Sequence, residues 1–236
     1  MAEYLKWDQE GEKYWETGVD KVVLFVQKTD GTYDNGIAWN GVTSIQVQPT
    51  GGEANPQYAD NIKYLNLFSL EENGATLEAF QFPDDFWPCN GYSPIGTGSK
   101  MYASAQDRRP FALAWRTRVG NDTSDQKYYK IHLLYGCKAS PSEMQYSTVN
   151  ESPEAGTMSW PITTTPPTMT DAPEGYRNTS YFVCNSRDYQ DTLASQLAWL
   201  EGKLYGTAAV TGTNAAEAVL PTLPSVDDLV THMIPA

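Results

Sequence analysis

The chain has 236 residues, of which 40% are hydrophobic and 12% aromatic; this composition excludes disorder along the whole chain and suits one globular domain with an additional arm, or two small domains. Acidic residues outnumber basic ones by 29 to 16, a formal net charge of −13, which is the reverse of the balance in proteins that grip nucleic-acid phosphates. No apolar stretch approaches the roughly 20 residues of a membrane-spanning helix, and residues 1–13 lack a hydrophobic signal region, so we expect neither secretion by that route nor anchoring.

Strand patterns dominate the first third of the chain. Residues 22–26 (VVLFV) form a short apolar run, and a turn rich in Asp, Asn and Gly follows it. Residues 37–48 predict a second strand, which Asn40 and Gly41 interrupt. Residues 49–61 are rich in Gly, Pro and Asn and predict a long inter-strand loop. Loops longer than their connection requires are often functional.

The next strands are expected to pair with each other. Residues 62–70 (IKYLNLFSL) and 75–82 (ATLEAFQF) flank a short polar connection, which predicts a hairpin. Two later strands are predicted at residues 128–137 and 157–164. Pro161 has no N–H to donate, so we expect the last strand to lie at a sheet edge or to contain a bulge.

The clearest alternation runs through residues 111–119. Large apolar side chains (Phe, Leu, Trp, Val) lie on one face, whereas the other face carries two alanines followed by Arg116 and Arg118. That second face has two cations and no large apolar residue. We therefore expect it to contact solvent or a partner.

One helix is predicted at about residues 189–205. Four leucines are spaced by four, three and four residues and form a single stripe: Leu193, Leu197, Leu200 and Leu204. Gly206 is suited to end the helix. Trp199 lies on the opposite side from the leucines, so we expect loops of the same chain or a neighbouring molecule to cover it.

The expected fold class is mainly β, a sandwich or barrel with one flanking α-helix, a long inter-strand loop and extended terminal arms. Residues 1–17 form the N-terminal arm, residues 18–206 the β domain including the helix, and residues 207–236 the C-terminal arm.

The residue types of common catalytic and metal sites are scarce. The chain has two histidines and three cysteines, Cys89, Cys137 and Cys184, which are far apart and contain no CxxC pair. We interpret the cysteines as small buried hydrophobic residues of a reducing compartment. His132 lies between apolar residues of a strand and is expected at a surface or an interface. We expect no enzyme activity, no cofactor and no metal.

Ordered sequence blocks carry the strongest functional signal. They are GVDKVVLFV, GIAWNGVTSIQVQPTGGEANPQYADNIKYLNLFSLEENGATLEAF, RRPFALAWRTRVGND, YKIHLLYG, TVNESPEAGTMSW, LAWLEGKLYG and LPTLPSVDDL. In this order they resemble the major tail proteins of bacteriophages with long, non-contractile tails. The resemblance covers roughly residues 18–229.

The resemblance implies a tail-tube-type β-sandwich or barrel whose copies form hexameric rings. The rings stack into a hollow tube through which genomic DNA is ejected into the host. The implied partners are other copies of the chain, a tape measure protein, a tail terminator and a distal tail protein. DNA would pass through the lumen without specific binding. The implied location is the virion tail, after synthesis and assembly in the cytoplasm of the bacterial host.

Two sets of residues are expected to serve assembly. Candidates for contacts between subunits are Pro49, Glu53, Asn55, Tyr58, Asp60, Arg116, Arg118, Trp199, Asp227 and Asp228. The expected acceptors for the two arginines are the acidic residues of the arms: Glu10, Glu12, Glu16, Asp227 and Asp228.

A conduit for DNA should carry few unpaired cations, because each one placed against a phosphate adds salt-sensitive affinity. The residues expected to line the lumen are Asn66, Glu71, Glu72, Thr76 and Glu78, which the predicted hairpin would bring together.

Two alternatives stay open. A carbohydrate-binding β-sandwich would use the seven tryptophans and fifteen tyrosines as stacking surfaces and remain monomeric. A ring-forming tail terminator would share the architecture but cap the tube without polymerising.

Overall fold

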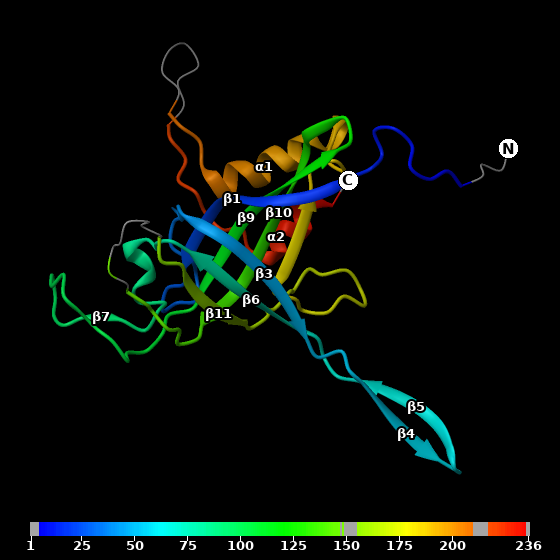
Figure 1. Cartoon of the computed structure of the whole chain (residues 1–236), viewed down its shortest axis with the longest axis horizontal. Coiled ribbons are helices and arrows are strands. Elements are labelled where there is room, and N and C mark those ends of the chain that lie inside the picture. Colours follow the sequence, from blue (N-terminus) through cyan, green and yellow to red (C-terminus); the bar gives the residue numbers. More distant parts are fainter. Residues whose placement is uncertain (1–4, 147, 149–154, 210–216, 235–236) are drawn as a thin grey trace.

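The computed structural model describes residues 5–146, 148, 155–209 and 217–234 (Figure 1). The strands are β1 Trp15–Val26, β2 Ile37–Ala38, β3 Val42–Thr50, β4 Ala54–Ala59, β5 Ile62–Phe68, β6 Glu72–Ala79, β7 Ser93–Pro94, β8 Tyr102–Ala103, β9 Phe111–Asn121, β10 Ser124–Ala139, β11 Met158–Thr164 and β12 Tyr181–Asn185. The helices are α1 Ala194–Tyr205 and α2 Val226–Met233, with short 3₁₀ turns at Asp84–Phe86 and Asp191–Leu193.

One large antiparallel sheet organises the fold. Its strands follow the order β2-β1-β9-β10-β11-β6-β3, and β12 pairs with β10 beside this path. The main helix, α1, lies along the sheet, and the shorter α2 lies near it (Figure 1). The prediction of a mainly β fold with one main helix is confirmed.

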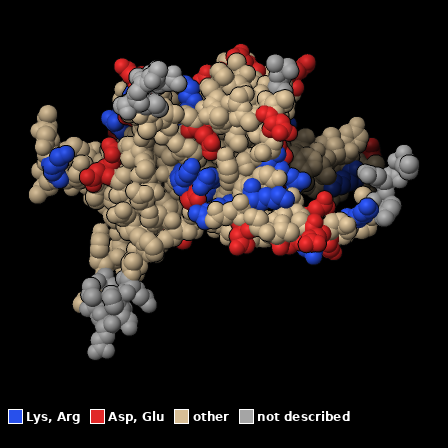
Figure 2. Space-filling model, turned by 90° about the horizontal axis from the view of Figure 1, so that it is seen from above, with Lys and Arg blue, Asp and Glu red and all other residues tan. Residues whose placement is uncertain are grey.

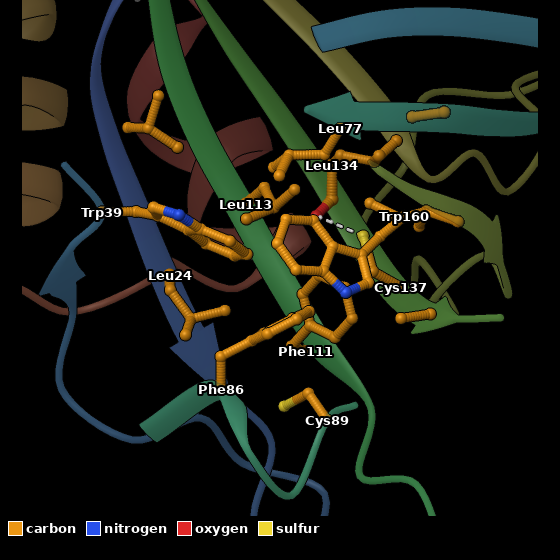
Figure 3. Packing of buried hydrophobic residues seen from close by; sticks show 14 of the residues in the cluster. Leu24, Trp39, Leu77, Phe86, Cys89, Phe111, Leu113, Leu134, Cys137 and Trp160 are labelled. Carbon is orange, nitrogen blue, oxygen red and sulfur yellow. Dashed lines mark hydrogen bonds between the residues drawn. The ribbon is translucent and has the colours of Figure 1, made fainter. Parts of the chain in front are cut away.

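Aromatic packing holds the two halves of the sheet together. Trp160 of β11 is fully buried and packs against Trp39, Phe82 and Phe86, with ring centroids 5.4 to 5.7 Å apart. Figure 3 shows Leu24, Phe111 and Leu113 around the same rings. Leu24 of β1 belongs to the same cluster and Ile45 of β3 packs against it. These two strands lie near opposite ends of the sheet order, so burying the cluster requires the sheet to close on itself.

A second apolar layer lies on the other face of β1, β9 and β10. Ala112 and Ala114 of β9 are fully buried there, in one cluster with Leu200 and Leu204 of α1 and Leu229 of α2. The expectation that this face of residues 111–119 is open to solvent or a partner is therefore wrong at its alanines. Their small side chains let the helices approach the sheet closely.

The helices differ from expectation in two ways: α1 starts later than predicted, and a second helix, α2, was not predicted. α1 begins at Ala194, later than the predicted residue 189, because a 3₁₀ turn precedes it. Residues 226–233, placed in an extended C-terminal arm, form α2 instead. A capping box between Ser225 and Asp228 starts this helix. Its His232 ring stacks on Trp199 at 4.2 Å, so part of the tail covers that tryptophan within the chain.

Pro161 does not mark an edge. Its strand, β11, lies between β10 and β6. The carbonyl of Pro161 accepts a hydrogen bond from the Ser140 N–H, just beyond the last β10 pair, Ala139 with Ile162. In antiparallel pairing a residue's N–H and C=O point to the same side. The side of Pro161 that lacks an N–H therefore faces the end of β10, and no hydrogen bond between β11 and β6 is lost.

The predicted pairing of residues 62–70 is also wrong. The segment forms β5, which pairs with β4, whereas β6 pairs with β3 and β11. Residues 49–61 are therefore largely strand. At the N-terminus, β1 begins at Trp15, which pairs with Gly120 of β9, so the arm ends before residue 17.

Candidate assembly surfaces

The β4–β5 hairpin projects from the body of the protein (Figure 1). All of its residues are exposed. Asp60 and Asn61 both have positive φ, of 50° and 61°, which is typical of the type I′ turn that closes tight hairpins. Five predicted contact residues lie along it or at its base: Pro49, Glu53, Asn55, Tyr58 and Asp60.

The hairpin exposes large apolar side chains, of which only Tyr58 was among the predicted contact residues. Tyr58, Tyr64 and Phe68 are 71%, 68% and 69% exposed. Ile62, Leu65 and Leu67 add to the same element. Large apolar side chains exposed together on one projecting element often mark an interaction site. The sequence signal was the run IKYLNLF, which has few polar residues for a strand exposed on both sides.

The base of the hairpin depends on a glycine. Gly51 has a φ of 83°, and a Cβ at this position would lie 2.1 Å from the Leu70 carbonyl oxygen. Such a contact is impossible without moving the backbone. Gly51 therefore allows the two ends of the hairpin to meet closely where it leaves the sheet.

A polar face covers the outer side of β3, β6 and β11. The side chains of β6 alternate: Ala75 and Leu77 are buried, whereas Thr76 and Glu78 point to the opposite face. Paired positions across the three strands are Ser44 with Glu78 and Ser159, Gln46 with Thr76 and Pro161, Gln48 with Gly74 and Thr163, and Thr50 with Glu72. We call this set the polar sheet face. Apart from Pro161 and Gly74 it consists of hydroxyl, amide and acidic side chains, and Lys138 pairs with Thr163 at its border.

The predicted lumen residues fall into two places. Glu72, Thr76 and Glu78 lie on the same face of β6 and belong to the polar sheet face. Glu71 immediately precedes that strand. Asn66 lies on β5 in the projecting hairpin, away from the other four. The five residues therefore do not form one hairpin, because β5 and β6 do not pair.

The two arginines of β9 bind a carboxylate that the sequence analysis missed. The Arg116 guanidinium donates to both oxygens of Asp20, at 2.7 and 3.0 Å, and Arg118 donates to Asp20 Oδ2 at 3.1 Å. Hydrogen bonds from Arg116 lower the pKa of the Asp20 carboxyl, and those from Arg118 add to the effect. The expected acceptors in the arms are therefore not the partners within the chain. The register of β1 on β9, which sets Asp20 opposite Arg116, provides the nearer acid.

The acids of the C-terminal segment have roles within the chain. Asp227 accepts hydrogen bonds from the backbone of Thr170 and Asp171, and Asp228 completes the cap of α2. The Thr170 hydroxyl, which also donates to Asp227, is the main cause of the lowered pKa of the Asp227 carboxyl, and the Ser225 side chain is the main cause of the lowered pKa of Asp228.

Replacing Asp20 with asparagine should destabilise the fold. The substitution removes the charge that both arginines share, and the Arg116 side chain is only 20% exposed. Charge-assisted hydrogen bonds typically contribute about 1.5–3 kcal/mol. We expect the free energy of unfolding in urea to fall by about 1–3 kcal/mol. Asp125→Asn, at an exposed position near the start of β10, is the control, and equal effects of the two changes would contradict the role of Asp20.

His132 lies in a buried polar network between β1, β9, β10 and β12. Its ring stacks on Trp115 with centroids 5.1 Å apart, its Nε2 lies 2.9 Å from Thr117 Oγ1, and its Nδ1 lies 2.8 Å from Tyr181 Oη. Because Thr117 donates its proton to Glu16, the neutral ring carries its proton on Nε2 and accepts from Tyr181. The expected surface histidine is thus a buried one.

The surrounding charges do not offset the burial of this imidazole. Burial lowers the pKa of His132 despite the opposing effect of Glu16. Burial would by itself raise the pKa of Glu16, but hydrogen bonds from Lys130 and Thr117 outweigh it and leave this pKa lowered.

Stability should therefore decrease as the pH falls below 6.5. In that range the unfolded chain binds a proton at residue 132 that the folded chain resists, so protonation favours unfolding, by at most about 1.4 kcal/mol per pH unit. Urea unfolding of the wild-type chain and of His132→Phe between pH 6.5 and 5 measures this. The difference in unfolding free energy between the two chains should shrink as the pH falls. A pH-independent difference would show that His132 does not titrate with the fold.

Charges of both signs are mixed over the face seen from above in Figure 2. Several lysine and arginine side chains lie near one another across the middle of this face, with acidic side chains above and below them (Figure 2).

The metal-ligating side chains are dispersed among the described residues, and two of the cysteine thiols have raised pKa values. They contain no cluster of three or more His, Cys, Asp or Glu side chains that could hold a metal ion. Burial raises the pKa of Cys89 and of Cys184 to about 12, so both thiols stay protonated at neutral pH. Neither of the two described helices is long and apolar enough to cross a membrane.

The chain matches no protein-family model, and no curated protein is significantly similar to it.

Proposed function

We propose that this chain is a structural protein of a phage tail, the subunit of a hollow tube built from stacked hexameric rings. In this role it acts as a building block and not as a catalyst, and its partners are further copies, a tape measure protein, a tail terminator and a distal tail protein. The observation that carries the proposal is the coexistence of a projecting apolar hairpin and a polar sheet face on one acidic chain.

Each surface suits one requirement of a tube. The exposed apolar side chains of the hairpin lose contact with water only if another molecule covers them. The polar sheet face has the composition that a DNA conduit needs, because hydroxyl, amide and acidic groups do not hold phosphates. The resemblance of the ordered sequence blocks to major tail proteins supports the same role.

The polar sheet face is the candidate for the lumen wall. Glu72→Lys combined with Glu78→Lys should leave assembly intact but make the tubes retain DNA, with a retention that falls as salt rises. Retention is measured by co-sedimentation of tubes with linear DNA at several salt concentrations. Asp107→Lys combined with Asp125→Lys changes the net charge equally at exposed sites on other segments. Equal retention by both pairs would remove this face from the lumen.

Electron microscopy of the purified chain over a range of concentrations tests the proposal. Stacked rings with a central channel would support a tube subunit. Separate rings that never stack would identify a terminator, and dispersed monomers would favour a binding module.

Four of the seven tryptophans offer no stacking surface for the carbohydrate-binding alternative. Trp39, Trp115 and Trp160 are buried at 3%, 2% and 0% exposure, and Trp199 is stacked on His232. These tryptophans therefore serve packing and do not form a stacking platform for a sugar.

A further inference from the structure

An apolar pocket opens between β12, α2 and the segment of residues 166–179. Its volume is about 500 Å³, within the range of about 300–1,000 Å³ typical of binding pockets. Leu133, Leu200 and Leu229 lie in its wall, and Phe182 and Met233 add to it. None of these residues belongs to the hairpin or to the polar sheet face.

The rim of the pocket is apolar and exposed. Val183, Tyr176 and Ile234 are 49%, 71% and 50% exposed. Val183 belongs to β12, which pairs with β10 on one side and with no other strand among the described residues. Arg177 is the only charged residue in the described lining. The site therefore presents apolar surface with a single positive charge beside it.

The projecting hairpin has the complementary chemistry. Its tip carries Tyr58 and Ile62, 71% and 63% exposed, on either side of Asp60, the acidic residue of the turn, and the basic Lys63 pairs with Tyr58 just behind the turn. An exposed two-stranded hairpin is at best marginally stable alone in water, so it benefits from a surface to pack against. In the fold the hairpin extends away from α2 (Figure 1). The hairpin therefore does not reach the pocket of its own chain.

We propose that the tip of the β4–β5 hairpin of one copy docks into this pocket of a second copy, with Asp60 facing Arg177. The two surfaces lie at different places on one chain, so the contact is head-to-tail and can repeat along a growing assembly. The inference rests on the proposed function, for which it identifies the receiving site of the hairpin.

Separating the two surfaces on different chains tests the docking. The first chain has residues 53–69 replaced by two glycines and keeps the pocket. The second carries Val183→Glu with Ile234→Glu, both at exposed rim positions, and keeps the hairpin. A third chain carries both changes and controls for any other contact. Ile95→Glu, at a position 64% exposed on another loop, controls for an added surface charge.

Binding between immobilised and free chains is measured by interferometry. The second chain, which supplies the hairpin, should bind the first chain at least tenfold more tightly than it binds the third chain, which has no intact pocket. Equal binding by the first and third chains would overturn the docking, and so would normal polymerisation of the second chain. The comparison remains decisive even if the wild-type chain forms no tubes, so failure of the docking and failure of the proposed function are separable.

Reversal of charge adds an independent check. Asp60→Arg, added to the second chain, which keeps the hairpin, should weaken binding about two- to fivefold, as for an exposed ion pair. Arg177→Asp, added to the first chain, which keeps the pocket, should restore most of the lost affinity. If the exchanged pair binds no better than either single change, Asp60 does not face Arg177.

Discussion

Replacing residues 53–69 with two glycines should abolish tube growth while leaving the folded subunit intact. The residues removed are all exposed, and β4 and β5 pack chiefly against each other. Their loss therefore costs the body of the protein little apolar burial. Circular dichroism and the melting temperature should stay nearly unchanged, whereas light scattering and electron microscopy should detect no tubes.

A matched control separates the hairpin's surface from its mere presence. Tyr58→Ser with Phe68→Ser keeps the chain length and the Asp60–Asn61 turn but removes two exposed rings, and it should raise the concentration needed for assembly. Normal tubes from the shortened chain would refute an assembly role for the hairpin. A large fall in its melting temperature would show that the hairpin stabilises the subunit itself.

Trp160→Ala should give the largest loss of stability of any single change considered. The indole is fully buried among Trp39, Phe82 and Phe86, and truncating a buried Trp typically costs about 3–5 kcal/mol. Its Nε1–H has no hydrogen-bond partner among the described residues, so the cost arises from packing alone. Urea unfolding followed by circular dichroism measures it.

Two variants bracket this expectation. Trp160→Phe keeps an aromatic ring in the site and should cost less than the alanine change. Trp7→Ala, at a position 73% exposed, should stay within about 0.5 kcal/mol of the wild type. If Trp160→Ala is as mild as Trp7→Ala, the two halves of the sheet are not held together by this cluster.

Local sequence patterns predicted the strands and the helix that are buried on one face or on both faces. The alternation of residues 111–119 and the apolar run of residues 128–137 identified β9 and β10, and the leucine stripe identified α1. Buried strands and helices repeat their apolar residues at a fixed spacing, so these elements can be identified from sequence alone.

Pairing choices were less predictable, because they depend on competition between neighbouring strands. The segment 62–70 has a possible partner on either side along the chain. The tight turn at Asp60 and Asn61 pairs this segment with β4. The sequence of β4 predicts a loop, because it contains Pro56 and follows Gly51 and Gly52. α2 was missed because it is short, although Ser225 and Asp228 form a recognisable cap.

The site residues show the same division. Exposure of the predicted contact residues on the hairpin followed from their polar, turn-rich composition. The binding of Asp20 to both arginines depends on the register of β1 on β9, which contains two irregularities. Such irregularities move a side chain relative to its neighbours and leave no clear signal in the sequence.

A cryo-electron microscopy reconstruction of assemblies grown from the purified chain tests the central claim most directly. We expect rings of six copies stacked into a tube, with the polar sheet face of β3, β6 and β11 lining an open channel and the hairpin reaching another copy. A chain that stays monomeric at every concentration, or assembles with that face buried away from any channel, would contradict the account.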